Sequence, residues 1–122
     1  MTHWLQIAAG GALGAVLRYA TVTGLGRITG GAFPWGTLTA NALGSLLMGL
    51  VAGLVITRVD VRAAAPFLMT GLLGGYTTFS AFSLDTVRLW ERGEFAAALG
   101  YVGLSLLLSL GGLVAGLALV RG

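Results

Sequence analysis

Long uninterrupted runs of apolar residues dominate this sequence, and a few charged positions separate them. Residues 28–57, 63–84 and 95–120 contain no charged side chain, and the first 26 residues contain only Arg18 besides His3. A helix needs about 20 mostly apolar residues to cross the hydrocarbon core of a bilayer. We therefore predict four transmembrane helices, at about residues 4–26, 33–57, 64–91 and 95–120.

The segments between these runs are short, and two prolines support the proposed helix starts. Pro34 and Pro66 stand near the beginnings of the second and third spans, where a missing backbone N–H costs little. The first run has no basic segment before it, which favours a retained helix over a cleaved signal peptide. Residues 1–122 are expected to form one all-α membrane domain in contact with the lipid bilayer.

Composition agrees with this class. Hydrophobic residues make up 57% of the chain and charged residues 9%, whereas about 25% of an average soluble domain is charged. The net charge of +3 comes from scattered arginines without a basic cluster, so nucleic acid is not an expected partner. There is no cysteine and no catalytic constellation of side chains, so an enzyme is not expected.

The arginine count assigns no single orientation in the membrane. Four spans place three arginines on each face, so the positive-inside rule is balanced. Either the chain has one weakly determined topology, or copies insert in both directions and pair antiparallel; the balance favours the second. The arginines are Arg58, Arg62 and Arg121 on the side of the termini, and Arg27, Arg88 and Arg92 on the other.

Each predicted span carries two glycines four residues apart. Glycines at this spacing let helix backbones approach closely in lipid, where the hydrophobic effect does not drive helices together. Four short spans enclose little space, so we expect an oligomer with tight interfaces. The pairs are Gly10 and Gly14, Gly49 and Gly53, Gly71 and Gly75, and Gly112 and Gly116.

Polar residues inside the first, second and fourth spans have two interpretations each. Arg18 either extends to an interface or lines a wet vestibule that attracts anions. Asn41 lies on one helix face with Thr37, and its amide either joins helices or donates hydrogen bonds to an ion. Ser105 and Ser109 are four residues apart, and either bond their own backbone or line a path.

The third span contains a candidate break in its middle. Gly74 and Gly75 precede Thr77 and Thr78, and glycine tolerates unwound backbone while threonine is a helix N-cap. Such a break exposes carbonyls that can hold a cation and N–H groups that can hold an anion. The alternative is a flexible kink without a site.

Residues after the candidate break add aromatic and charged side chains. Phe79 and Phe82 are three residues apart and share a helix face; their ring edges carry partial positive charge, although such pairs are usually packing. Ser83 follows in the same stretch. Asp85 and Arg88, also three apart, predict an intrahelical ion pair at the membrane boundary.

Three segments resemble the fluoride channel family known as Fluc or CrcB, and the resemblance covers essentially the whole chain. They are GGALGAVLRY at residues 10–19, GTLTANALGSLLMG at 36–49 and GLLGGYTTFSAFSLD at 71–85, of which the third is the most specific. The resemblance implies an antiparallel homodimer in the cell (inner) membrane with two passive, fluoride-selective pores. It also implies that the protein lets fluoride leave the cytoplasm and so protects against fluoride toxicity.

Individual positions match the family's functional residues. Phe79 and Phe82 match paired phenylalanines that coordinate fluoride through ring edges, and Asn41 matches a pore-lining asparagine. Backbone carbonyls of Gly74 and Thr77 match a structural sodium site at the dimer centre. The remaining expected positions are Ser83, Ser105 and Ser109 along the pore and Arg18 at the vestibule. Tyr76 and Asp85 depart from the family, which often has an apolar residue and a glutamate there.

Two other functions compete with this interpretation. A small multidrug-type proton-coupled exporter also has four spans, but it needs a buried acid in the first span, where this chain has Arg18. Asp85 is the only candidate acid, on the wrong helix. A non-transporting subunit of a membrane assembly would leave the polar positions at Asn41, Thr77 and Thr78 without a purpose.

Overall fold

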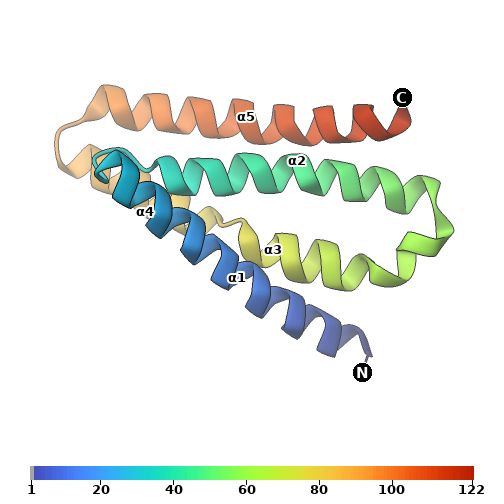
Figure 1. Cartoon of the computed structure of the whole chain (residues 1–122). Coiled ribbons are helices and arrows are strands. Elements are labelled where there is room, and N and C mark those ends of the chain that lie inside the picture. Colours follow the sequence, from blue (N-terminus) through green and yellow to red (C-terminus); the bar gives the residue numbers. More distant parts are fainter. Residues whose placement is uncertain (1) are drawn as a thin grey trace.

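The computed structural model describes residues 2–122, which are almost entirely helical (Figure 1). No strand occurs among them, so the expected all-α class is confirmed. The long helices are α1 (Thr2–Thr29), α2 (Trp35–Thr57) and α5 (Phe95–Arg121). Between α2 and α5 lie η1 (Val59–Ala64), η2 (Pro66–Leu73), α3 (Gly74–Tyr76) and α4 (Phe79–Glu91).

Three of these helices, α1, α2 and α5, are long and apolar enough to cross a membrane. Their bounds lie within a few residues of the predicted first, second and fourth spans. The largest difference is at the end of α1, which continues through Arg27 to Thr29. It stops at Gly30, whose N–H bonds the Gly26 carbonyl at 2.9 Å and whose φ of 85° is favourable only for glycine.

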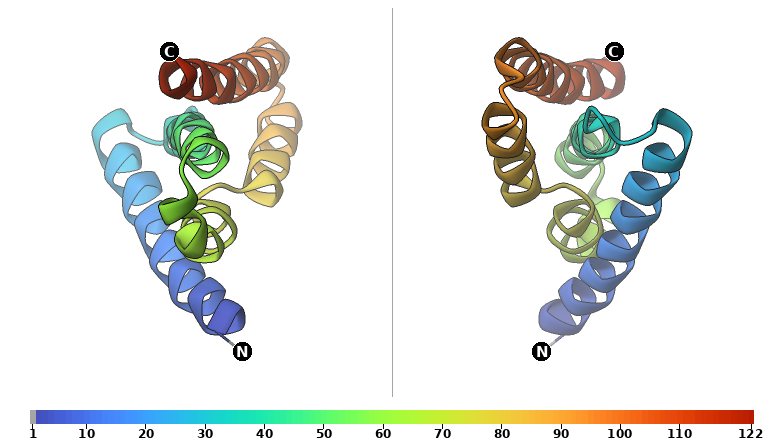
Figure 2. Two further views of the ribbon diagram at one scale, coloured as in Figure 1. Left: turned by 90° about the vertical axis from the view of Figure 1, so that its right-hand side faces the viewer. Right: turned by 90° about the vertical axis from the view of Figure 1, so that its left-hand side faces the viewer.

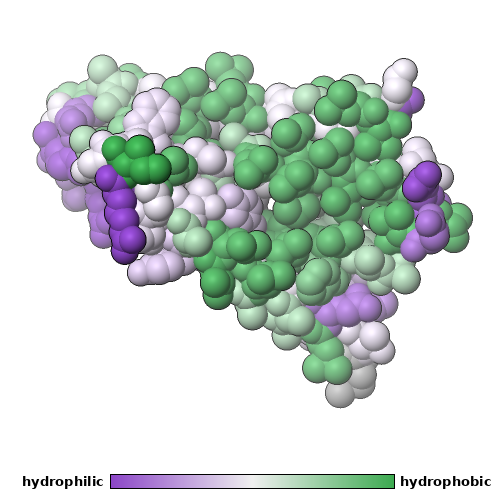
Figure 3. Space-filling model, in the orientation of Figure 1, coloured by the Kyte–Doolittle hydropathy of each residue, from purple (hydrophilic) through white to green (hydrophobic). Residues whose placement is uncertain are grey.

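The helices run back and forth between two ends of the molecule. Both termini and η1 lie at one end, while the loops between α1 and α2 and between α4 and α5 lie at the other (Figure 1). Figure 3 shows a broad hydrophobic surface over the middle and hydrophilic residues near both ends. This distribution is typical of a multi-pass membrane protein, whose middle faces lipid or other apolar surfaces.

Glycines allow the closest helix contacts within the chain. A Cβ atom on Gly10 would lie 2.5 Å from the Phe67 carbonyl oxygen, and one on Gly14 would overlap the Leu72 carbonyl. Gly116 approaches the backbone of α2 in the same way. The glycine pairs therefore do enable close packing, but between helices of one chain. These glycines are therefore no evidence for the expected oligomer, which must be argued from other residues.

The third predicted span differs most from a regular helix. Pro66–Leu73 is wound as a π-helix, and α3 continues it for three residues. Thr77 and Thr78 are then extended, with ψ angles of 158° and 125°, before α4 begins. Figure 2 shows α4 displaced sideways from η2 and α3; α3 and η2 pack on α1, while α4 packs mainly on α5.

Candidate functional site

The extended residues Thr77 and Thr78 are held by the side chain of Asn41 on α2. The Asn41 amide nitrogen donates to the Thr78 carbonyl at 3.0 Å, and the Thr78 N–H donates to Asn41 Oδ1 at 2.7 Å. The Thr78 hydroxyl accepts from the Ala81 N–H at 3.1 Å and so caps α4. Asn41 thus joins two elements and still has a second amide N–H to donate.

The same hydrogen bonds leave carbonyl groups of α3 without helical partners. In a continuous α-helix the Thr78 N–H would bond the Gly74 carbonyl, but here it bonds Asn41. Arg18 approaches the neighbouring carbonyls: its Nη1 donates to Gly75 at 3.2 Å and to Thr77 at 3.4 Å. A guanidinium at membrane depth is costly, and these carbonyls compensate part of that cost. The vestibule expected around Arg18 stays a prediction.

A cavity of about 230 Å³ opens beside the extended residues. We call it the central cavity. Side chains from α2, α4 and α5 meet around it, and they include most of the residues singled out in the sequence. The lining residues are Asn41, Ser45, Thr77, Thr78, Phe79, Phe82, Ser105, Leu106 and Ser109.

Ser105 is the most informative residue of the central cavity. Its side chain is only 5% exposed, and its hydroxyl has no hydrogen-bond partner among the described residues. A buried polar group without a partner is destabilising, so each one in a native protein calls for an explanation such as a bound water or ion. Ser105 therefore marks a position where the cavity accepts a polar occupant.

Aromatic rings continue from the central cavity to the loop before α2. The ring centroids of Phe79 and Phe82 are 5.4 Å apart, those of Phe82 and Tyr101 5.3 Å, and those of Tyr101 and Phe33 5.5 Å. We call these four residues the aromatic ladder. Tyr101 is fully buried within it, whereas Phe79 is 76% exposed at its other end.

Tyr101 also makes the polar contact that the sequence did not indicate. Its hydroxyl donates to Asp85 Oδ2 at 3.1 Å. The predicted Asp85–Arg88 ion pair was wrong: among residues 2–122 the one salt bridge joins Arg92 to Glu94. Tyr101 precedes Ser105 by one helical turn, and Ser109 follows by another, so the three side chains share one face of α5. This spacing in the sequence could have indicated that Tyr101 belongs with the two serines.

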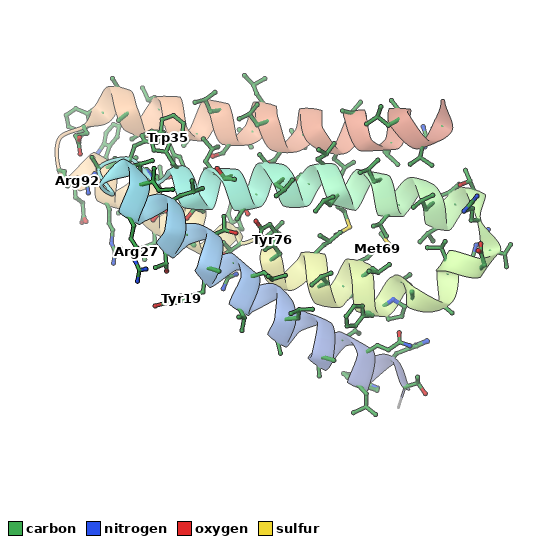
Figure 4. All side chains as sticks on the ribbon, viewed as in Figure 1. Tyr19, Arg27, Trp35, Met69, Tyr76 and Arg92 are labelled. Carbon is green, nitrogen blue, oxygen red and sulfur yellow. The ribbon has the colours of Figure 1, made fainter. Side chains whose placement is uncertain are left out.

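Two singled-out residues lie outside this arrangement. Ser83 is not among the residues that line the central cavity; its hydroxyl donates to the Phe79 carbonyl at 3.0 Å, within α4. Tyr76 is buried, and its hydroxyl shares a hydrogen bond of 2.9 Å with Thr21 on α1. Tyr76 therefore supports the packing of α3 on α1; Figure 4 shows it in the middle of the molecule.

The chemistry of the cavity suits a small anion. Its polar side chains are hydroxyls and an amide, all of which can donate hydrogen bonds, and its lining includes no acidic residue. Phe79 and Phe82 also line the cavity, and the edge of an aromatic ring carries partial positive charge. Among residues 2–122 no group of three or more histidine, cysteine, aspartate or glutamate side chains is placed to hold a metal ion.

Comparisons with known proteins agree with one another. A family model described as "CrcB-like protein, Camphor Resistance (CrcB)" matches residues 5–117. A relative named "Fluoride-specific ion channel FluC" from Cereibacter sphaeroides is 58% identical over 118 residues, covering 97% of this chain and 94% of the relative. Relatives with the same name come from Paracoccus denitrificans (56% identical; 100% and 98% covered) and Rhizobium meliloti (48%; 99% and 98%).

Proposed function

The chain belongs to the CrcB-like family, as its motifs indicated, and from this premise we propose that it is a fluoride-selective passive ion channel. In the cell (inner) membrane such a channel lets fluoride leave the cytoplasm and protects the cell from its toxicity. The family is one of ion channels rather than enzymes, and we propose no catalytic step. The observation that carries the proposal is the buried hydroxyl of Ser105 in the central cavity, which has no hydrogen-bond partner among residues 2–122.

Fluoride is small and strongly hydrated, so a pore must replace its water with donors. Asn41 and Ser105 supply an amide N–H and a hydroxyl, and the edges of Phe79 and Phe82 supply weaker positive charge. Weak, successive contacts let an ion enter and leave again. From Ser105 the path continues to Tyr101 and Asp85. Ser109 completes the set of proposed pore residues that line the central cavity. Ser83 lies outside that cavity, and its place along the pore stays a prediction.

Each protomer offers only part of the assembly that we propose. Phe79 is 76% exposed and Gly74 is exposed, so both are available to a second copy. We propose an antiparallel homodimer whose halves each contribute a broken third span. The Gly74 and Thr77 carbonyls suit a sodium ion at its centre, because the break frees the Gly74 carbonyl and a hard cation prefers oxygen ligands. When bound, sodium supplies fixed positive charge. Arg18 donates to the Gly75 and Thr77 carbonyls, so the ion would share the Thr77 carbonyl with this guanidinium.

Fluoride efflux from liposomes tests the function directly. Purified protein is reconstituted with internal fluoride, and external fluoride is followed with an electrode; chloride-loaded liposomes are the control. With internal potassium fluoride and valinomycin to carry the compensating potassium, a passive channel releases fluoride down its electrochemical gradient and releases no chloride from the control liposomes. A proton-coupled exporter requires a proton gradient, and an assembly subunit releases nothing. Either of these last results contradicts the proposal.

Removing the Ser105 hydroxyl separates function from stability. In Ser105→Ala we expect fluoride efflux to fall about fivefold, because the ion loses one charged hydrogen bond that water replaces only in part. Thermal stability should stay the same or rise, since a buried group without a partner disappears. Leu106→Ala, at the same cavity, is the control without a lost donor. Equal efflux in wild type and Ser105→Ala excludes this hydroxyl from the path.

The sodium site predicts a cation-dependent dimer. We expect the detergent-solubilised dimer to dissociate more readily when sodium is exchanged for N-methylglucamine, because the Gly74 carbonyls then lose their ligand. The population of dimer is measured by light scattering, and exchange of chloride for another anion is the control. A dimer that is equally stable in both cations argues against the central site.

A further inference from the structure

Tyr76 is the last residue of α3 and stands directly before the extended residues Thr77 and Thr78. It is 8% exposed and lies between α1 and α2. Its hydroxyl lies 2.9 Å from the Thr21 hydroxyl on α1, and on α2 a Cβ atom at Gly44 would lie 3.2 Å from its ring. Through Tyr76, the end of α3 therefore contacts two of the long helices.

The hydrogen bond between Tyr76 and Thr21 has one direction. The Thr21 hydroxyl donates its single proton to the Leu17 carbonyl at 3.0 Å, so it accepts from the Tyr76 hydroxyl. Both side chains line a cavity of about 250 Å³, and the other residues that line it are leucines. Because leucine side chains offer no polar partner, loss of this bond would leave a hydroxyl in apolar surroundings, which is costly. The bond therefore fixes the orientation of the Tyr76 side chain.

The position of α3 depends on such contacts with other helices. The helix consists only of Gly74–Tyr76, between the π-helix η2 and two extended residues. A helix this short is stable only through tertiary packing. Arg18, also on α1, donates to the carbonyls of the residues on either side of Tyr76, at Gly75 and Thr77. Side chains of α1 therefore set where α3 ends and how the carbonyls at the break are oriented.

We propose that Tyr76 is a positioning residue for the cation site at the break. Its hydroxyl, held by Thr21, keeps the Gly74 and Thr77 carbonyls in place before a cation binds. Ligands that are already ordered bind more tightly, because the cost of ordering them is not paid on binding. Tyr76 acts through α3, and its side chain is not a ligand. The inference rests on the sodium site of the proposed function.

Sodium affinity is measured through stability. A ligand that binds only the native state raises stability with the logarithm of its concentration over its Kd. The thermal unfolding midpoint of the detergent-solubilised protein is recorded over a series of sodium concentrations, with N-methylglucamine keeping the ionic strength constant. Each variant is compared with its own midpoint in N-methylglucamine alone. A change that only weakens packing lowers all midpoints equally and leaves the sodium concentration needed for a given rise unchanged.

In Tyr76→Phe we expect this sodium concentration to rise about fivefold, because the ring stays and one hydrogen bond is lost. Thr21→Val removes the same bond from its other side and should give the same shift. The double variant should shift no further than either single variant, since both remove one interaction. Thr21→Ser keeps the hydroxyl and should behave as wild type. Tyr19→Phe, at a side chain on α1 that is 72% exposed, is the matched control.

The outcomes separate positioning from packing and from the channel function. A raised sodium requirement in Tyr76→Phe and Thr21→Val, absent from Tyr19→Phe, supports the inference. An unchanged requirement in Tyr76→Phe, with midpoints lowered equally in both cations, overturns it and leaves Tyr76 a packing residue. A wild type that sodium does not stabilise overturns the sodium site and this inference together. Fluoride efflux from wild-type liposomes still tests the proposed channel separately.

Discussion

Asn41→Asp should nearly abolish fluoride flux. The substitution keeps the size of the side chain and the acceptor for the Thr78 N–H, so the extended residues retain one of their two bonds to α2. It replaces an amide donor with a negative charge at the central cavity. Two unit charges about 4 Å apart repel by about 4 kcal/mol at an effective dielectric constant of about 20. That corresponds to about a thousandfold slower permeation.

Asn41→Ser separates the charge from the lost hydrogen bonds. It removes the amide that joins α2 to Thr78 without adding charge, so its loss of flux should be much smaller than that of Asn41→Asp. Efflux from liposomes gives the rates, and gel filtration shows that each variant remains folded. Efflux from Asn41→Asp within tenfold of wild type would show that fluoride does not pass near this side chain.

The helices could be predicted from the sequence because the bilayer imposes a length of apolar residues that hydropathy reveals. Thr77 and Thr78 are extended in the middle of the third predicted span, and unwound backbone at membrane depth would need polar partners. Asn41, a polar residue within the second predicted span, was therefore a plausible partner for these extended residues. Its two bonds to Thr78 show that Asn41 joins two elements, which was one of its two interpretations, and it also lines the central cavity. Donation of a hydrogen bond to an ion stays a prediction.

Contacts between helices distant in the chain could not be predicted in the same way. Asp85 has Arg88 at helical spacing, yet its carboxylate accepts from Tyr101 on α5. Spacing shows which residues share a face of one helix, but the direction of that face is set by packing with the others. The same applies to Arg18, whose carbonyl partners Gly75 and Thr77 depend on how closely the glycines of α1 approach α3.

Phe79 and Phe82 differ in how much of each ring is packed inside the protomer. Substitution of the two residues should therefore affect stability differently. Phe82 packs against the buried cluster that contains Leu38, Leu89 and Tyr101, while Phe79 is 76% exposed in the protomer. Phe82→Ala is expected to lower stability as well as flux, because it empties a partly buried site. Leucine fills much of that volume but lacks a positive ring edge, so it is the better probe of ion contact.

In the double variant Phe79→Leu/Phe82→Leu we expect fluoride efflux to fall about a hundredfold, if each ring edge contributes about 1.4 kcal/mol, near the upper range of aromatic contacts. The dimer should remain assembled, which light scattering checks. Phe33→Leu is the control, since it changes a ring of the aromatic ladder outside the central cavity. Efflux at the wild-type rate from an assembled double variant would show that these rings only pack. The path would then depend on the hydroxyls and the Asn41 amide alone.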